Sequence, residues 1–425
     1  MHMLRVRDDY RRAQLAIAAL FCVLGFQYAT WAARLPAIKT ELGLTDAELG
    51  LLLMATGVGA AVSFPLVAVL TRRLGSRRLA VLSALFLGVL LIALAAAPNY
   101  PVALLVMCAD GVGVGCLNVA MNAQGAELES RFERTAMARL HATFSAGSLG
   151  AALLASGVNT VTSSMTAHFA TATVLVLLLV AFANRGLLTE KEAGTEADTD
   201  ASRSSEEGTP DPERKPRKGL TLPTRVTLWM GCAMVFGTVA EGAMNDWSAL
   251  YMKEVAHASS HVAPLGIAVV SVMMVLARLF ADGWRSRWGD GRIVRFGSVL
   301  AGAGLALALL AGGVVPALIG FACVGLGIAA VTPCVYVAAA RQGSQALALV
   351  AAMGTTGLLA GPPVIGFIAN ATTLTWGMAT VAASASLVAL CALRIRWAPA
   401  PERDTADADA DADARNAEPS VATGP

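Results

Sequence analysis

The sequence predicts an all-α membrane protein with twelve transmembrane helices in two pseudo-symmetric halves of six. Three observations indicate this fold class. The 425 residues are 56% hydrophobic and 15% charged, whereas a soluble chain carries about 25% charged residues. Long uncharged stretches recur along the chain, with a mean hydropathy of +0.61 overall. Related stretches also recur between the first and second halves.

Runs of apolar residues define the expected spans, because a bilayer core about 30 Å thick needs about 20 apolar residues per helix. Separated by polar residues, Pro or Gly, such runs occupy 13–34, 47–71, 79–97, 101–125, 140–160, 166–184, 225–250, 262–284, 293–312, 314–340, 345–369 and 373–394. The first run continues into Gln27 and Trp31, so we interpret it as a span rather than a secretory signal. The run 140–160 is short and rich in Ala, Gly and Ser.

The distribution of Lys and Arg predicts that both termini are cytoplasmic, because in that orientation the outer loops hold only Arg34, Lys39 and Lys253. Residues 185–224 and 395–425 are rich in acidic and small polar residues, which favours disorder. The expected segments are a cytoplasmic N-terminus 1–12, a six-helix half 13–184, a disordered linker 185–224, a second half 225–394 and a disordered acidic tail 395–425.

An internal repeat relates the two halves. Trp31 aligns with Trp247 at an offset of 216 residues, and the stretch 74–78 aligns with 288–292 at an offset of 214. Halves related in this way can rock about a central cavity. Small residues in two spans are expected to permit sliding where the halves meet, namely Gly147, Gly150, Gly354, Gly357 and Gly361.

Composition also excludes several classes of function. A net charge of +2 without long basic runs gives no reason to expect a nucleic-acid partner. The seven cysteines stand singly in apolar stretches, without a CxxC pair, so neither a metal nor another cofactor is expected. No catalytic set or phosphate loop indicates an enzyme. The expected partners are a small solute and the lipid bilayer, and we expect a monomer.

Polar side chains within the apolar spans are candidate functional residues, because hydrocarbon makes them costly unless they contact protein or water. Gln27 and Trp31 share a helix face with Arg34, although an aromatic belt with a snorkelling arginine explains the last two equally well. Asp110 is expected near the middle of the membrane. Asn118 and Asn122 lie deeper in the same span.

Further candidates lie in three later spans. His141 begins the fifth span near the level of Asn122, so these residues and Asn118 can form a cluster, although an interfacial histidine is the more common arrangement. Glu241 is expected well inside the membrane, with Asn245 one turn further on and Asp246 beside it. Arg278 and Asp282 are four residues apart, which favours a structural ion pair.

These features resemble the major facilitator superfamily of transporters. Its signature follows the second span, and here Ala68 to Arg78 keeps Gly75 and the Arg77-Arg78 pair but has Arg72 at the position of the usual acid. In the second half, the corresponding stretch contains Asp282 and Gly289. The gating residues that the resemblance implies are Arg72, Arg73, Gly75, Arg77, Arg78, Arg278, Asp282, Gly289 and Arg292.

More narrowly, stretches beginning at Thr30, Asn118, Leu140, Glu241 and Gly361 resemble the fucose-permease-like branch and its bacterial members. That resemblance implies a protein of the bacterial cytoplasmic membrane that takes up sugar-like solutes with protons. In one departure from the branch, Asn118 stands where the sugar permeases have a glutamate. Because Asn cannot titrate, the proton must then be carried by Asp110, Glu241 or Asp246, with His141 a further candidate.

The resulting hypothesis is a secondary transporter, with a proton-coupled symport mechanism and alternating access. The residues expected to contact the solute are Gln27, Trp31, Asn118, Asn122 and Asn245. Two alternatives remain open: proton-driven export of drugs or amphipathic metabolites, and a non-transporting receptor or scaffold that signals through 185–224. The drug-exporting branch usually has an arginine in the fourth span, and here the nearest charge is Asp110.

Overall fold

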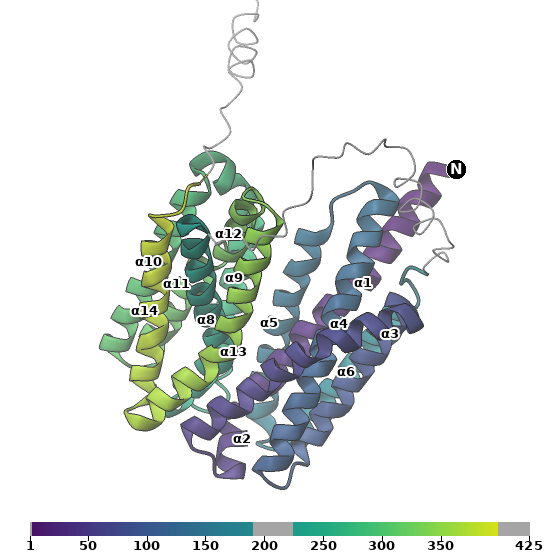
Figure 1. Ribbon diagram of the computed structural model, residues 1–425. Coiled ribbons are helices and arrows are strands. Elements are labelled where there is room, and N and C mark those ends of the chain that lie inside the picture. The colour runs from purple at the N-terminus through teal and green to yellow at the C-terminus, as the bar shows by residue number, and fades with distance from the viewer. Residues whose placement is uncertain (1, 190–223, 398–425) are drawn as a thin grey trace, which may run out of the picture.

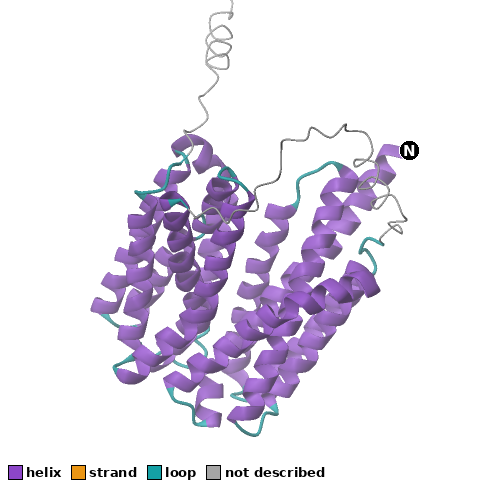
Figure 2. Cartoon of the chain, in the orientation of Figure 1, coloured by secondary structure: helices purple, strands orange, loops and turns teal. Residues whose placement is uncertain are grey.

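The computed structural model describes residues 2–189 and 224–397, which form helices joined by short loops with no strand among them (Figures 1 and 2). The helices are α1 (His2–Ala32), α2 (Leu35–Leu42), α3 (Asp46–Ala95), α4 (Tyr100–Phe132), α5 (Met137–Val161), α6 (Met165–Asn184), α8 (Arg225–Glu254), α9 (Leu265–Trp288), α10 (Asp290–Ala311), α11 (Val314–Ile328), α12 (Val331–Ala340), α13 (Ser344–Ala371) and α14 (Leu374–Ala392). Most of the expected linker and tail lies outside the described residues.

Ten helical segments of the described chain are long and apolar enough to cross a membrane. Two differences separate this number from the twelve expected runs. The runs 47–71 and 79–97 form one 50-residue helix, α3. The run 262–284 falls on α9, whose apolar part covers only Leu265–Ala281.

A backbone break divides α3 and recurs in the second half. Gly75 has φ 76° and ψ 162°, which is not helical, and glycine adopts this conformation readily because it has no Cβ. Gly289, between α9 and α10, has nearly the same values, φ 77° and ψ 151°. The two glycines occupy equivalent places in the aligned stretches 74–78 and 288–292, so the backbone supports the repeat at this point.

The helices pack as two groups, one before and one after residues 190–223 in the sequence. In the first group α1 packs against α5 and α6, and α3 packs against α4; in the second, α8 packs against α13 and α14, and α10 against α11. The groups meet where α3 contacts α13 and where α5 contacts α9. Figure 1 shows them closest together at the end that carries α2 and further apart at the end that carries the N-terminus.

The glycines expected between the halves pack within them instead, so that prediction was wrong. Gly147 on α5 meets the α1 backbone at Cys22, and Gly357 on α13 meets α8 at Val235. The remaining members of the set, Gly150, Gly354 and Gly361, likewise face α1 or α8 of their own group.

Close approach between the groups involves other glycines. A Cβ atom added to Gly50 of α3 would lie 2.8 Å from the carbonyl oxygen of Pro362 and 3.2 Å from the Cα of Gly366, both on α13. Backbones can approach this closely only because neither glycine has a side chain. The contact between α3 and α13 therefore depends on Gly50.

Capping side chains fix where several helices begin. The Thr45 hydroxyl accepts a hydrogen bond from the Glu48 amide at 3.2 Å, and the Glu48 carboxylate accepts one from the Thr45 amide at 2.8 Å. This capping box starts α3. Asn99 and Ser164 start α4 and α6 with one such bond each.

Large apolar side chains point outward along many helices. Leu105 is 71% exposed, Phe296 73% and Leu310 84%. Contiguous apolar surface of this kind is unfavourable in water but is covered by acyl chains in a bilayer. The outer surface therefore suits a protein embedded in lipid.

Candidate functional site

Two adjacent residues of α1 each donate a hydrogen bond to a buried acid. The Gln27 amide donates a hydrogen bond to Asp110 Oδ1 of α4 at 2.6 Å, within the first group of helices. The Tyr28 hydroxyl donates to Asp246 Oδ1 of α8, in the second group. Both acids are buried, with 2% and 4% of their surface exposed. Consecutive positions of one helix thus contact an acid from each group.

The Gln27–Asp110 contact is only partly satisfied. Gln27 Oε1 and Asp110 Oδ2 have no hydrogen-bond partner among the described residues. An ionised carboxylate in such a place is costly, because a buried charge without enough partners loses its hydration without replacement. A proton on Asp110 removes that cost, which makes this acid suited to proton exchange.

A second polar cluster joins α5, α8 and α9. Arg278 Nη2 lies 3.1 Å from Glu241 Oε1, and Arg278 Nη1 donates to the Ser145 hydroxyl at 2.9 Å. The side chains of Arg278 and Glu241 are 28% and 26% exposed, so solvent reaches them. Arg278 therefore pairs with an acid of the neighbouring helix α8, and the expected pairing with Asp282 stays a prediction. The side chain of Asp282 lies outside the described part of the structure.

The predicted asparagines and His141 do not form one hydrogen-bonded cluster in the described residues. The Asn122 amide donates to Asn118 Oδ1 at 2.7 Å, so these two residues bond to each other. The His141 ring instead packs edge-on against Phe21, with centroids 4.9 Å apart. Asn245 donates to the Glu241 carbonyl of its own helix at 3.2 Å, beside the cluster around Arg278.

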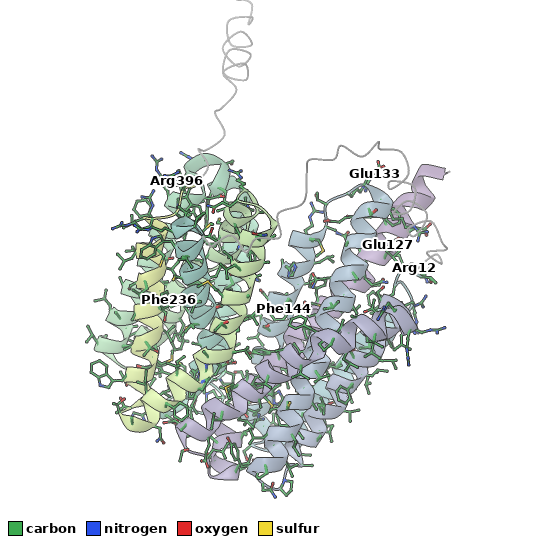
Figure 3. The ribbon with its side chains drawn as sticks, in the orientation of Figure 1. Arg12, Glu127, Glu133, Phe144, Phe236 and Arg396 are labelled. Carbon is green, nitrogen blue, oxygen red and sulfur yellow. The ribbon has the colours of Figure 1, made fainter. Side chains whose placement is uncertain are left out.

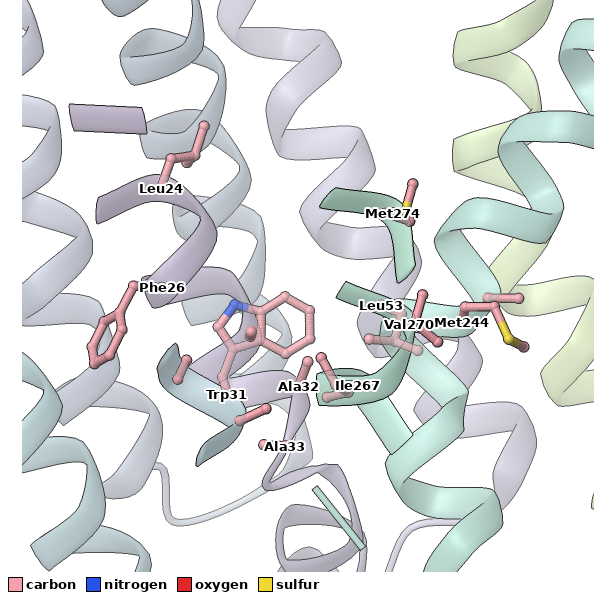
Figure 4. Close-up of a cluster of buried hydrophobic side chains, with 14 of the residues drawn as sticks. Leu24, Phe26, Trp31, Ala32, Ala33, Leu53, Met244, Ile267, Val270 and Met274 are labelled. Atoms are coloured by element: carbon pink, nitrogen blue, oxygen red, sulfur yellow. The ribbon is translucent and has the colours of Figure 1, made fainter. Parts of the chain in front are cut away.

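Trp31, expected to stack on solute, is a buried packing residue in this conformation. It is 1% exposed and packs edge-on against Tyr28, with centroids 4.7 Å apart. Figure 4 shows its ring within an apolar cluster that also contains Ile267 and Val270 of α9. Trp31 thus supports the position of Tyr28 where the two groups meet.

Several hydrogen bonds join the two groups at the end that carries α2. Lys39 Nζ lies 2.8 Å from Glu254 Oε1, and it also bonds Asp46 at 2.6 Å. Ser156 and Asn159 of α5 donate to backbone carbonyls of the loop before α9, at His261 (2.6 Å) and Ser260 (2.7 Å). These contacts close the protein at this end.

The charge of Lys39 persists to high pH. Partial burial lowers its pKa, but the hydrogen bonds to Asp46 and Glu254 outweigh that effect, so the pKa of Lys39 is raised above the ordinary lysine value. The ion pairs of Lys39 therefore stabilise the protein fully below about pH 10.4, as long as Asp46 and Glu254 are ionised. This stabilisation is lost only as the pH rises through the raised pKa of the lysine.

At the opposite end, two arginines of the described chain form bonds within their own group. Arg77 donates to the Asn184 carbonyl at 2.7 Å, and Arg285 bonds Asp290 at 2.8 Å. Of the other implied gating residues, Arg72, Arg73, Arg78 and Arg292 are exposed. Among the described side chains of the second half, Asp290 thus contacts an arginine at this end.

Sequence reasoning missed Tyr28 and noted Ser145 only as a residue on the face of His141; both contact the other group of helices. Tyr28 is the residue after Gln27, and a phenol at this depth needs a hydrogen-bond partner. Ser145 lies one turn after His141 and has the short side chain typical of close helix packing. Arg34, by contrast, was singled out, and its Nε donates to buried His168 at 3.0 Å.

These features define a polytopic helical membrane protein whose two groups of helices meet around buried polar contacts, which is the architecture of a membrane transporter. The chain belongs to the Major Facilitator Superfamily, whose sequence profile matches residues 15–344. Its family and fold are therefore those of a transporter and not of an enzyme.

Relatives support this membership over most of the chain. An uncharacterised transporter of the same superfamily from Yersinia pestis is 33% identical over 396 residues, which cover 88% of this chain and 95% of that protein. Membrane protein MosC from Rhizobium meliloti is 30% identical over 360 residues, covering 84% of this chain and 83% of that protein.

Solved structures share the fold at low sequence identity. A D-xylose-proton symporter matches with a TM-score of 0.69 at 14% identity, covering 92% of this chain and 98% of that one. The nucleoside transporter NupG matches with a TM-score of 0.66 at 15% identity, covering 90% of this chain and 98% of that one. Such identities indicate a common fold and leave the solute open.

Proposed function

We propose that the protein is a secondary active transporter that moves a small polar, sugar-like solute across the cytoplasmic membrane together with a proton. The observation that carries the proposal is the pair of contacts from α1, in which Gln27 bonds Asp110 and Tyr28 bonds Asp246. Helix α1 therefore bonds one acid in each group, and each bond depends on whether that acid carries a proton.

The physical argument starts from the cost of a buried charge. Asp110 and Asp246 are nearly inaccessible in this conformation, so each is stabilised when it carries a proton or keeps its donor. Tyr28 and Asp246 belong to different groups of helices. A change in the protonation of Asp246 therefore changes a bond that holds the groups together, which couples proton movement to alternating access.

The solute contacts are proposed around Glu241, Arg278 and Asn245. Both charged side chains are partly exposed where α8 and α9 face α5. Hydroxyl groups of a sugar-like solute can accept hydrogen bonds from the guanidinium and donate them to the carboxylate. Similarity to a structure described as a D-xylose-proton symporter is compatible with this solute class.

The proposed topology has twelve spans, with α3 counted as two, α9 as one and α11 with α12 as one, and both termini in the cytoplasm. On this topology the end that carries α2 is external. The contacts of Lys39, Ser156 and Asn159 then close the outer side, and the conformation faces inward. We keep 13–184 and 225–394 as the halves, with 185–224 as the linker.

The test is a solute-induced pH change in proteoliposomes that contain the full-length protein. Sugars and polyols would be screened, with a few cationic drugs to represent the export alternative. Addition of a transported sugar should make the external medium more alkaline, because protons enter with it. Asp246→Asn should abolish the pH change, because the amide cannot carry a proton.

A matched control is Glu133→Gln, which alters an exposed acid at the end of α4 and should leave a pH signal. Solute entry measured with radiolabel separates coupling from transport. Radiolabelled uptake that proceeds without any proton movement in the unmodified protein would overturn the symport proposal. Acidification of the external medium on adding a drug would favour drug–proton exchange instead, because protons then leave as the drug enters.

A further inference from the structure

A cavity with three arginines lies at the end of the first group that carries the N-terminus. It has a volume of about 820 Å³ and is lined by α1, by the end of α4 and by residues 185–189. Arg12, Arg131 and Arg185 contribute positive charge, against one acid, Asp9. Figure 3 shows Arg12 at the same end of the molecule as Glu127 and Glu133.

The cavity is built from fixed parts. Arg12 Nη2 donates to the Arg185 carbonyl at 2.7 Å, which ties α1 to the segment 185–189. Buried Gln124 bonds both the amide and the carbonyl of Leu188, at 2.9 and 3.1 Å, and so secures the same segment. These hydrogen bonds attach the segment 185–189 to α1 and α4, which form the rest of the lining.

An aromatic wall supports the arginines. Arg131 lies 5.8 Å from the centre of the Phe132 ring, and Phe132 packs edge-on against Tyr10 with centroids 5.4 Å apart. Arg134 in turn lies 5.2 Å from the Tyr10 ring. Cation–π contacts of this kind orient guanidinium groups but do not neutralise them. The cavity keeps a surplus of positive charge that suits a phosphate group.

Exposed apolar side chains near two of the arginines favour a phosphate group that belongs to a lipid. Leu15, three residues after Arg12, is 51% exposed, and Phe182, three residues before Arg185, is 50% exposed. Residues three apart lie on the same face of a helix. Arg12 and Arg185 thus each lie about one turn from an outward-facing apolar side chain, so a headgroup held by these arginines would place its acyl chains near Leu15 and Phe182.

We propose that this cavity is a binding site for one anionic phospholipid, with its phosphate held by Arg12, Arg131 and Arg185 and its acyl chains along Leu15 and Phe182. Basic pockets between membrane helices recognise such headgroups through charge and hydrogen bonding. The lipid belongs to the inner leaflet if the proposed topology is correct. The binding itself depends neither on that topology nor on transport.

Native mass spectrometry of the full-length protein in detergent tests the site. The added probes are dioleoyl-phosphatidylglycerol, the matched phosphatidylcholine and inorganic phosphate. One phosphatidylglycerol should stay bound, about tenfold more tightly than phosphatidylcholine, since only the first is anionic. Loss of one arginine should weaken its binding about fivefold, as expected for one charge at a lipid surface.

Two variants guard against a folding defect. Arg131→Gln removes a guanidinium that packs on Phe132. Arg12→Lys keeps the positive charge at the position that bonds the Arg185 carbonyl. Arg12→Lys should therefore lose less lipid affinity than Arg12→Gln. Arg394→Gln, an exposed arginine after α14, is the matched control and should bind as the unmodified protein does. Equal binding of both lipids, or unchanged binding in the cavity variants, would overturn the proposal. Displacement of the lipid by equimolar phosphate would indicate a free-anion site instead.

Discussion

The contact between Tyr28 and Asp246 makes the sharpest prediction about how the two groups of helices are held together. Tyr28→Phe removes the phenol hydroxyl and keeps the ring that packs against Trp31. A hydrogen bond to an ionisable acceptor contributes about 1.5–3 kcal/mol, and Asp246 is too buried for water to replace the donor. A loss of about 2 kcal/mol raises the population that is open at the α2 end about thirtyfold.

Hydrogen–deuterium exchange of the full-length protein measures this opening directly. Amides of α2 and of the loop 255–264 should exchange faster in Tyr28→Phe, because separation of the groups exposes both segments. Tyr100→Phe is the matched control: its hydroxyl bonds the Glu48 carbonyl within the first group. Unchanged exchange in Tyr28→Phe, or an equal increase in Tyr100→Phe, would refute the argument.

Three further variants test other contacts. Lys39→Met should increase exchange at the α2 end less than Tyr28→Phe does, because a partly exposed ion pair with Glu254 contributes about 0.2–1 kcal/mol. In the unmodified protein this ion pair should contribute equally from about pH 6 to about pH 9, because the pKa of Lys39 is raised. Gly50→Leu should separate α3 from α13 and slow transport, as measured by solute uptake. Gln27→Leu should lower the free energy of unfolding by about 1–3 kcal/mol in a denaturant titration, because Asp110 loses its donor.

Each of these variants has its own control. Lys253→Met alters a lysine that bonds within the second group, and comparable exchange in it would contradict the role of the Lys39 pair. The added side chain of Gly157→Leu enters open space. A similar loss of solute uptake in Gly157→Leu would therefore count against the importance of close packing at Gly50. Adding Asp110→Leu to Gln27→Leu should restore stability, because both partners are then apolar; a further large loss would be incompatible with this explanation.

The sequence predicted correctly those features that depend on one segment of the chain alone. The length and apolar character of each run predicted the helices, and the offset between 74–78 and 288–292 predicted a repeat that the similar backbone angles of Gly75 and Gly289 support. The depth of Asp110 within its run likewise predicted a buried acid. None of these inferences requires knowledge of which helices are neighbours.

Prediction failed where the partner lies on another helix. Spacing along one helix could offer only Asp282 as a partner of Arg278, and it gave no indication that the guanidinium reaches Glu241 of α8 and Ser145 of α5. The glycines at 147 and 357 were correctly identified as sites of close packing, but small residues do not specify which neighbour approaches. The positions of Arg12 and Arg131 in one cavity were equally inaccessible, because 119 residues of sequence separate them.

The adjacency of Gln27 and Tyr28 has a consequence for the order of events in a transport cycle. Gln27 and Asp110 belong to the same group and remain together when the groups separate, whereas Tyr28 and Asp246 are parted each time. In the proposed cycle, Asp246 would therefore contact the external solution at every opening of the α2 end, while Asp110 would stay buried until helices within its own group move. In the proposed symport mechanism the two acids would therefore exchange protons at different steps, although a single peptide bond joins the residues that contact them.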